Sequence, residues 1–245
     1  MKKMIGAFML FSALNLMAQV PSAEAILIKL DENMTSDNKI IHSKMTIHGR
    51  RSSRTMEAKS WIEGTKRSFT HFLAPAREQG TKMLKLEDQL WTYSPSTDRI
   101  IKISGHMLRQ SVMGSDLSYE DMMEDPILHS AYLAKNVGEE IINSRSCWVL
   151  DLQAAKNDIA YSARKIWVDK ERYLPLKEER YAKSGKLLKK MEIKEIARMN
   201  QRWIAKRAVF LDELKGGLGT EFEIISVEFD ADIPEFTFSK AALKK

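Results

Sequence analysis

The chain of 245 residues is 44% hydrophobic and 29% charged, and its formal net charge of +6 at pH 7 comes from 39 basic and 33 acidic side chains. This mild basicity suits an anionic membrane surface or partner, but it is also ordinary for a soluble protein, so it favours no single function. The one cysteine, Cys147, lies in an apolar run, which excludes an intramolecular disulfide and predicts a buried, unreactive thiol.

The N-terminus has the pattern of a secretory signal peptide. Lys2 and Lys3 precede an apolar run over residues 4–18, which is too short for a membrane helix of about 20 residues but suits the apolar core of a signal peptide. An uncleaved membrane anchor is the alternative. Ser12 and Asn15 make that alternative weaker, because they shorten the uninterrupted apolar stretch.

Small residues follow this run where a signal peptidase would cut. Ala23 and Ala25 flank Glu24 and predict cleavage after Ala25, so residues 1–25 are the expected signal peptide. One exported domain is expected over residues 26–245, because no linker rich in Pro, Gly or Ser divides this range.

Alternation of apolar and polar residues between turn signals dominates the exported chain and predicts mostly antiparallel sheet. Before it, residues 25–34 have the spacing of a short amphipathic helix that ends near Thr35. In residues 187–199 helical and strand spacing both occur, and the turns on both sides favour a strand. The expected strands span residues 41–48, 54–62, 68–73, 81–86, 89–93, 99–103, 137–142, 146–153, 161–168, 176–182, 187–199, 203–211 and 220–229.

A second short helix is expected between the two runs of strands. Ser118 can cap its start, Asp121 can complete a capping box, and Pro126 disfavours helical geometry at the residue before it. Residues 107–125 around it contain four methionines, whose flexible side chains suit a cavity for flexible ligands. Ordinary core filling is the alternative interpretation of these methionines.

Motifs for catalysis or metal binding do not occur in the sequence. The five histidines form no close ligand set, and there is no nucleophile elbow, P-loop or dinucleotide fingerprint. We therefore expect no enzyme, no catalytic residue, no metal and no cofactor. Helix capping and a solvated face explain the acidic residues 116–125, and the basic run 177–194 is expected on the exposed side of a hairpin.

Three sequence segments, residues 72–84, 90–95 and 113–121, resemble the LolA-like outer-membrane lipoprotein-sorting family of Gram-negative periplasms. The most specific of them is 113–121, where Leu117 stands in place of the more usual aromatic residue. The likeness continues in the same order to the end of the chain, through residues 165–169, 174–177, 184–186 and 236–238.

The resemblance implies a mainly β (α+β) fold, a strongly curved antiparallel sheet or incomplete β-barrel with covering helices, whose apolar interior holds acyl chains. It implies no catalytic residues. From apolarity and position we assign candidate ligand-binding residues of the cavity and its cover, which are Trp61, Phe69, Phe72, Leu84, Trp91, Tyr93, Met113, Leu117, Met122 and Met123.

The expected function is that of a periplasmic carrier, which binds acyl chains of lipids or lipoproteins and shuttles them toward the outer membrane. Its expected partners are an inner-membrane transporter and an outer-membrane acceptor, and no nucleic acid. Moving a chain of about 16 carbons into water costs roughly 12 kcal/mol at about 0.8 kcal/mol per methylene, so such a ligand needs a cover. The alternative is a non-transporting lipid- or lipoprotein-binding sensor on the same scaffold.

Residues 107–125 are expected to form a movable cover over this cavity. Gly105 and Gly114 give the backbone freedom at two points. The apolar underside of the cover would face acyl chains, and its acidic residues would face water.

Overall fold

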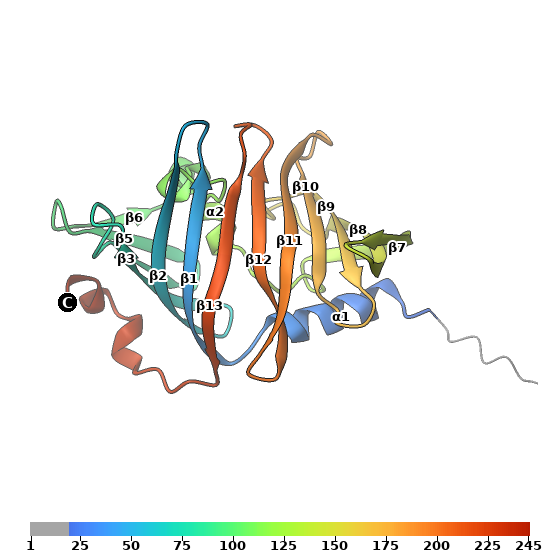
Figure 1. Cartoon of the computed structure of the whole chain (residues 1–245), viewed down its shortest axis with the longest axis horizontal. Helices are drawn as coiled ribbons and strands as arrows, with labels where there is room; N and C mark the ends of the chain where they lie inside the picture. The colour runs from blue at the N-terminus through green and yellow to red at the C-terminus, as the bar shows by residue number, and fades with distance from the viewer. Residues whose placement is uncertain (1–19) are drawn as a thin grey trace, which may run out of the picture.

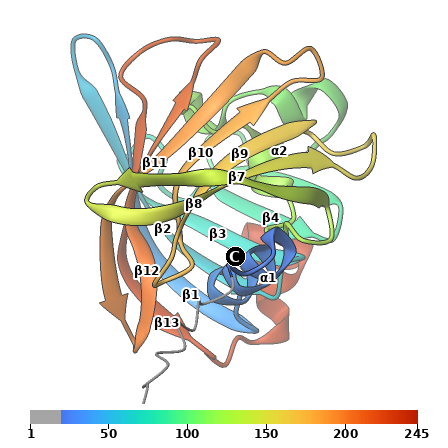
Figure 2. The same cartoon turned by 90° about the vertical axis from the view of Figure 1, so that its right-hand side faces the viewer.

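The structure is a computed structural model that describes residues 20–245; residues 1–19 of the expected signal peptide lie outside the described residues. Thirteen antiparallel strands form one sheet in the order β6-β5-β4-β3-β2-β1-β13-β12-β11-β10-β9-β8-β7. The sheet is strongly curved and stays open, with β6 and β7 as its edges (Figures 1 and 2). The expected fold class is therefore confirmed.

The strands match the expected ones closely. One half of the sheet contains β1 (Asn38–His48), β2 (Ser53–Glu63), β3 (Arg67–Ala74), β4 (Lys82–Leu86), β5 (Gln89–Ser94) and β6 (Arg99–Ile103). The other half contains β7 (Tyr132–Ile142), β8 (Arg145–Ala154), β9 (Ala163–Asp169), β10 (Pro175–Tyr181), β11 (Leu187–Met199), β12 (Arg202–Asp212) and β13 (Thr220–Phe229).

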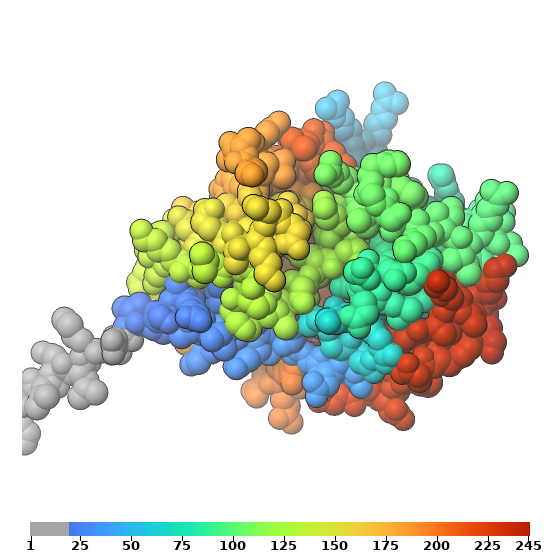
Figure 3. Space-filling view, turned by 180° about the vertical axis from the view of Figure 1, so that it is seen from behind, coloured from blue at the N-terminus to red at the C-terminus, as the bar shows by residue number. Residues whose placement is uncertain are grey.

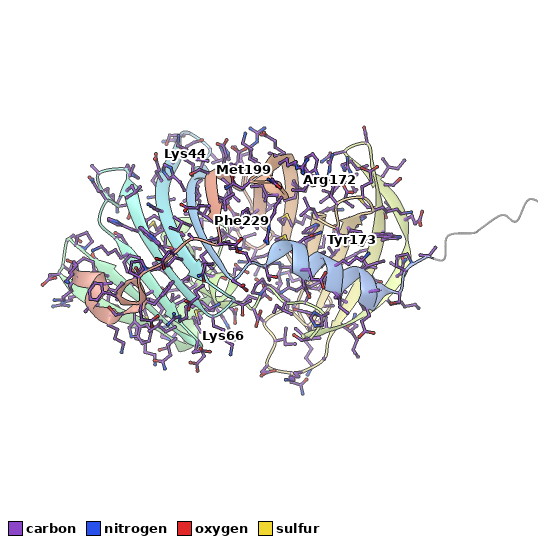
Figure 4. All side chains as sticks on the ribbon, turned by 90° about the horizontal axis from the view of Figure 1, so that it is seen from below. Lys44, Lys66, Arg172, Tyr173, Met199 and Phe229 are labelled. Carbon is purple, nitrogen blue, oxygen red and sulfur yellow. The ribbon has the colours of Figure 1, made fainter. Side chains whose placement is uncertain are left out.

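Helix α1 (Ala23–Met34) fills the concave side of the half that ends in β7 (Figures 1 and 4). Its start is fixed by Ser22, whose side chain accepts a hydrogen bond from the Ala25 amide at 3.1 Å. The helix buries an apolar stripe against β7, β8 and β9, as its amphipathic spacing predicts. The buried cluster comprises Ile26, Leu27, Leu30, Leu128, Tyr132, Trp148, Leu150, Leu152, Ile166 and Val168. The expected cleavage after Ala25 falls within the first turn of this helix.

Residues 104–131 connect the two edge strands, and we call them the cover segment. They contain the 3₁₀ helices η1 (Gly105–Arg109) and η2 (Val112–Gly114) and the short helix α2 (Tyr119–Met123). The expected capping box is present: the Ser118 side chain accepts from the Asp121 amide, and the Asp121 carboxylate accepts from the Ser118 amide at 2.7 Å. Seen from behind, this green segment lies over the sheet (Figure 3).

A second covering element packs on the opposite face of the sheet. The 3₁₀ helices η3 (Glu235–Phe238) and η4 (Lys240–Lys244) contact β3, β4 and β5 and bury Phe238 and Leu243 there. No helix was expected here, although residues 236–238 are among the segments that resemble the LolA-like family. In the part of the chain that the structure describes, no helix is long and apolar enough to cross a bilayer.

Candidate functional site

A cavity of about 380 Å³ lies between the cover segment and the inner face of β1, β2, β3, β4 and β13. This volume is within the range of about 300 to 1,000 Å³ that small-molecule sites have. Alternate residues of each strand line it, because successive side chains of a strand point to opposite faces. The strand residues involved include Ile41, Ser43, Met45, Met56, Ala58, Ser60, Ile62, Ser68, Thr70, Phe72, Lys85 and Phe222.

Pairing across the strands aligns these residues. Met45 lies opposite Met56, and Ser43 lies opposite Ala58, in the register of β1 and β2. Ser60 and Thr70 are opposite one another on β2 and β3, and their hydroxyl oxygens are hydrogen-bonded at 2.9 Å. Because these polar groups satisfy each other, the floor of the cavity stays compatible with hydrocarbon.

Burial distinguishes the two ends of the cavity. At one end Met45, Met56 and Val112 are between 1% and 7% exposed. At the other end Met34 is 38% exposed, and Gly64 is also exposed. The first end is therefore closed and apolar, and the second is the mouth. Figure 4 views the molecule from the side of the mouth, with Lys66 of the β2–β3 turn labelled.

Ion pairs hold α2 of the cover segment against β10 and β11. Asp121 pairs with Lys189 and with Arg180 at 3.2 Å, and it accepts a hydrogen bond from the Tyr161 hydroxyl at 2.5 Å. The Asp121 side chain is only 4% exposed. Burial opposes its ionisation, but Lys189 and Arg180 outweigh burial and lower the pKa of Asp121 to about 2.

Two further carboxylates of the cover segment are fixed in the same way. Glu124 pairs with Arg164 of β9 and with Arg180 at 3.3 Å. Asp116 accepts hydrogen bonds from the Thr220 hydroxyl at 2.6 Å and from the Asp212 amide at 3.0 Å. The cover segment is thus attached to β9 through β13 along one side.

These contacts correct two expectations from the sequence. The acidic residues Asp116, Asp121 and Glu124 turn toward the sheet and do not face water. The basic run is not simply the exposed side of a hairpin, because Arg180 and Lys189 are only about one-seventh exposed. The buried carboxylates of Asp121 and Glu124 and the buried cations of the basic run stabilise one another, and hydrogen bonds from Thr220 and Asp212 stabilise Asp116, so these groups can leave water.

A family model described as "Uncharacterized protein" matches residues 64–245. The chain belongs to that family. No curated protein gives a significant match.

Solved structures with the same fold cover nearly the whole chain. A DUF1329 family protein from Desulfovibrio piger is 24% identical, covers 90% of this chain and 97% of its own, and has a TM-score of 0.83. A putative outer membrane lipoprotein-sorting protein domain from Vibrio parahaemolyticus is 23% identical, with coverages of 91% and 98% and a TM-score of 0.78.

A LolA superfamily protein from Nitrosomonas europaea is also 23% identical, with coverages of 91% and 100% and a TM-score of 0.75. These likenesses establish that the chain has the LolA-like fold, as the sequence resemblance implied.

Within this LolA-like fold, the ten candidate ligand-binding residues divide between two faces of the sheet. Phe72, Leu117 and Met122 line the cavity. Met113 and Met123 pack against the buried cluster beside it. The remaining five form a cluster with Phe238 and Leu243 on the opposite face and do not line the cavity; they are Trp61, Phe69, Leu84, Trp91 and Tyr93.

Several lining residues were missed from the sequence. Met45, Met56 and Phe222 form the apolar wall, and Lys39 and Lys85 lie near the mouth. The alternation of residues 41–48 already placed Ile41, Ser43 and Met45 on one face, so that signal was available. Nothing in the sequence showed which face would be concave.

Proposed function

We propose that this protein binds an acyl chain of a lipid or lipoprotein in the cavity under the cover segment and carries it through the periplasm toward the outer membrane. The observation that carries this proposal is the closed, apolar end of the cavity, whose walls are Met45, Met56, Phe72 and Val112. At about 30 Å³ for each group of the size of a water molecule, the cavity accommodates roughly a dozen methylene-sized groups.

The fold supports the same proposal from a different side. The neighbours from Vibrio parahaemolyticus and Nitrosomonas europaea are described as an outer membrane lipoprotein-sorting protein domain and a LolA superfamily protein. An aqueous compartment between two membranes is where a covered acyl chain is needed, because exposing one costs about 0.8 kcal/mol per methylene. An inner-membrane transporter as donor and an outer-membrane acceptor complete the proposed route, which includes no catalytic step.

Transfer of a fluorescent lipid between two vesicle populations tests the carrier. Wild-type protein should accelerate the transfer, and the Ala58→Leu variant should do so less, because Ala58 lines the cavity and a larger side chain there takes up space. Thr55→Leu is the matched control, since Thr55 is exposed on the same strand and lies outside the cavity lining.

Binding without transfer would instead favour the sensor alternative, in which the same cavity detects a lipid or lipoprotein for a protein partner. Absence of both binding and transfer would contradict the proposal. Native mass spectrometry of protein from the periplasm, followed by lipid extraction, would identify the cargo, and N-terminal sequencing of that protein should begin at Ile26.

A further inference from the structure

The mouth of the cavity carries two lysines that have no carboxylate partner in the part of the chain that the structure describes. Lys39 of β1 and Lys85 of β4 both line the cavity. Each donates to a backbone carbonyl instead, Lys39 to Met34 at 3.4 Å and Lys85 to Thr65 at 3.0 Å. Carbonyl contacts leave the positive charges of both side chains without an ionic partner.

Burial makes the lack of an ionic partner energetically costly. Lys85 is only 7% exposed, and burial lowers its pKa, although Asp125 and Glu87 act from a distance in the opposite direction. Burial, and then the nearby Arg202, lower the pKa of Lys39. A buried cation is stabilised by a nearby anion, and no carboxylate of the described residues forms an ion pair with either lysine.

The other charged groups of the lining are already engaged. Glu124 pairs with Arg164 and Arg180. Arg67 pairs with Glu63 and, at 2.7 Å, with Glu235. The lysines are therefore the charged groups of the lining that remain available to a ligand.

The cavity is thus charged at its mouth and apolar at its closed end, which matches the head group and the chain of an amphiphile. Lys39 and Lys85 lie at the mouth, on strand ends that pair near Ile62 and Ser68. From there β1 leads past Ile41 and Ser43 to the buried Met45 at the closed, apolar end.

We propose that Lys39 and Lys85 bind the oxyanion head group, a carboxylate or a phosphate, of an amphiphile whose acyl chain fills the closed end of the cavity. This inference rests on the proposed function and narrows its ligand class to anionic lipids. A neutral acyl chain would fill the same apolar space but would leave both ammonium groups desolvated and without an anion.

Calorimetric titration of the exported protein with amphiphiles that share a dodecyl chain tests this inference. Wild type should bind dodecanoate and dodecyl phosphate at least roughly tenfold tighter than dodecanol or dodecyltrimethylammonium, since a hydrogen bond to a charged group is worth more than a neutral one. Inorganic phosphate should not displace dodecyl phosphate, because it lacks the chain.

The double variant Lys39→Met/Lys85→Met should lose the preference for anions and keep its affinity for dodecanol, because methionine retains most of the aliphatic stem. Lys39→Met alone should lose part of the preference, and it serves if the double variant fails to fold. Lys44→Met is the matched control for Lys39→Met: Lys44 is on the same strand but outside the lining, so its loss also removes one positive charge and should leave the preference intact.

Equal affinity of wild type for dodecanol and the two anions would overturn the lysine site and leave the carrier proposal standing. A preference for anions that survives in the double variant would also overturn the site. Displacement by inorganic phosphate would show that the oxyanion binds without its chain, and would overturn the amphiphile as the ligand. If wild type bound no amphiphile at all, the carrier proposal itself would fail.

Discussion

The two halves of the curved sheet are covered in different ways. Over β7, β8 and β9 a continuous helix, α1, inserts Ile26, Leu27 and Leu30, which are at most 2% exposed, and the space is filled. Over β1 to β4 the cover segment consists of two 3₁₀ helices and a five-residue helix, and a cavity of about 380 Å³ remains.

The difference shows that curvature alone does not make a binding site. Both halves present an apolar concave face, and the covering element decides whether that face is filled. The cover segment is held by polar contacts of Asp116, Asp121 and Glu124 to strands on its far side. Val112 of the segment packs into the buried cluster at the closed end, and the space between that end and the mouth stays open.

Among the substitutions that test the difference between the two halves, Leu27→Asp should lower the stability most. Leu27 is 1% exposed in the filled half, and an unpaired carboxylate there should lower the free energy of unfolding by at least about 4 kcal/mol. Urea denaturation followed by circular dichroism measures it. Ile28→Asp is the control, since Ile28 is 37% exposed on the same helix and should cost below about 1 kcal/mol. Similar losses in both variants would contradict the filled core.

Acid should next weaken the attachment of the cover segment. The pKa of Asp121 in the folded protein, about 2, is below the usual value of 3.8. The stabilisation that ionised Asp121 contributes to the free energy of unfolding is therefore fully present above about pH 4 and is lost as the pH falls toward 2. A shift of this size is worth about 2 kcal/mol. Urea unfolding at neutral and acid pH measures it.

Asp121→Asn should remove this part of the pH dependence and cost about 2 to 3 kcal/mol at neutral pH, because Lys189 and Arg180 lose a partner. Glu120→Gln, at the preceding position of α2, should keep the wild-type profile. An unchanged profile in Asp121→Asn would show that other carboxylates cause the acid sensitivity.

Leu117→Asp should affect binding more than stability. Leu117 lines the cavity, so a carboxylate there would meet the acyl chain and weaken binding at least tenfold. In lipid-free protein the group can reach water in the cavity, and the loss of stability should be about 1 kcal/mol. Fluorescent fatty-acid binding is measured beside urea melts of delipidated protein. A loss of several kcal/mol in the stability of delipidated Leu117→Asp would assign the cover segment to the fixed core. Equal fatty-acid binding by the variant and wild type would refute its role as a cover.

Adding volume should have the smallest effect in the open half. Ala58→Leu extends into the cavity and should change the free energy of unfolding by below about 1 kcal/mol. Cys147→Leu places extra volume at a fully buried position of a packed cluster and should cost about 1 to 3 kcal/mol. Urea denaturation measures both variants. An equal loss of stability in Ala58→Leu and Cys147→Leu would mean that the cavity cannot accommodate the larger side chain.

The strands were predictable from the sequence because alternation is a local signal. Residues 187–199 and 220–229 form β11 and β13 with the expected bounds. Strand β7 begins at Tyr132, five residues before the expected start. Its first residues were missed because β7 is an edge strand, on which Leu133 and Val137 are exposed. Its alternation therefore does not mark an apolar face that would identify a buried strand.

The faces of the strands were harder to assign. Phe69 and Phe72 are three positions apart on β3, so their side chains lie on opposite faces and cannot line one cavity. Aromatic size indicated burial for both residues, and both are buried. Only the packing of η3 and η4 on the outer face shows that Phe69 belongs to that side.

The ionic attachment of the cover segment could not be predicted from local patterns. Asp121 meets Arg180 and Lys189 across 59 and 68 residues of sequence. Charged residues on a strand are usually solvated, so a sequence without its fold gives no reason to pair them. For the same reason, the sequence did not show that Lys39 and Lys85 line the cavity.

The centre of the sheet is formed by strands from the two ends of the described chain. β1 pairs with β13 from Lys39 opposite Phe229 to Ile47 opposite Thr220, so this ladder closes the longest loop in the fold. Closing this loop is entropically unfavourable and is offset only once most other contacts have formed, so such non-local pairing slows folding. The flanking strands are joined by local hairpins and can form earlier. Because Phe222 of β13 completes the wall beside Met45, the ability to hold a ligand arises late in folding.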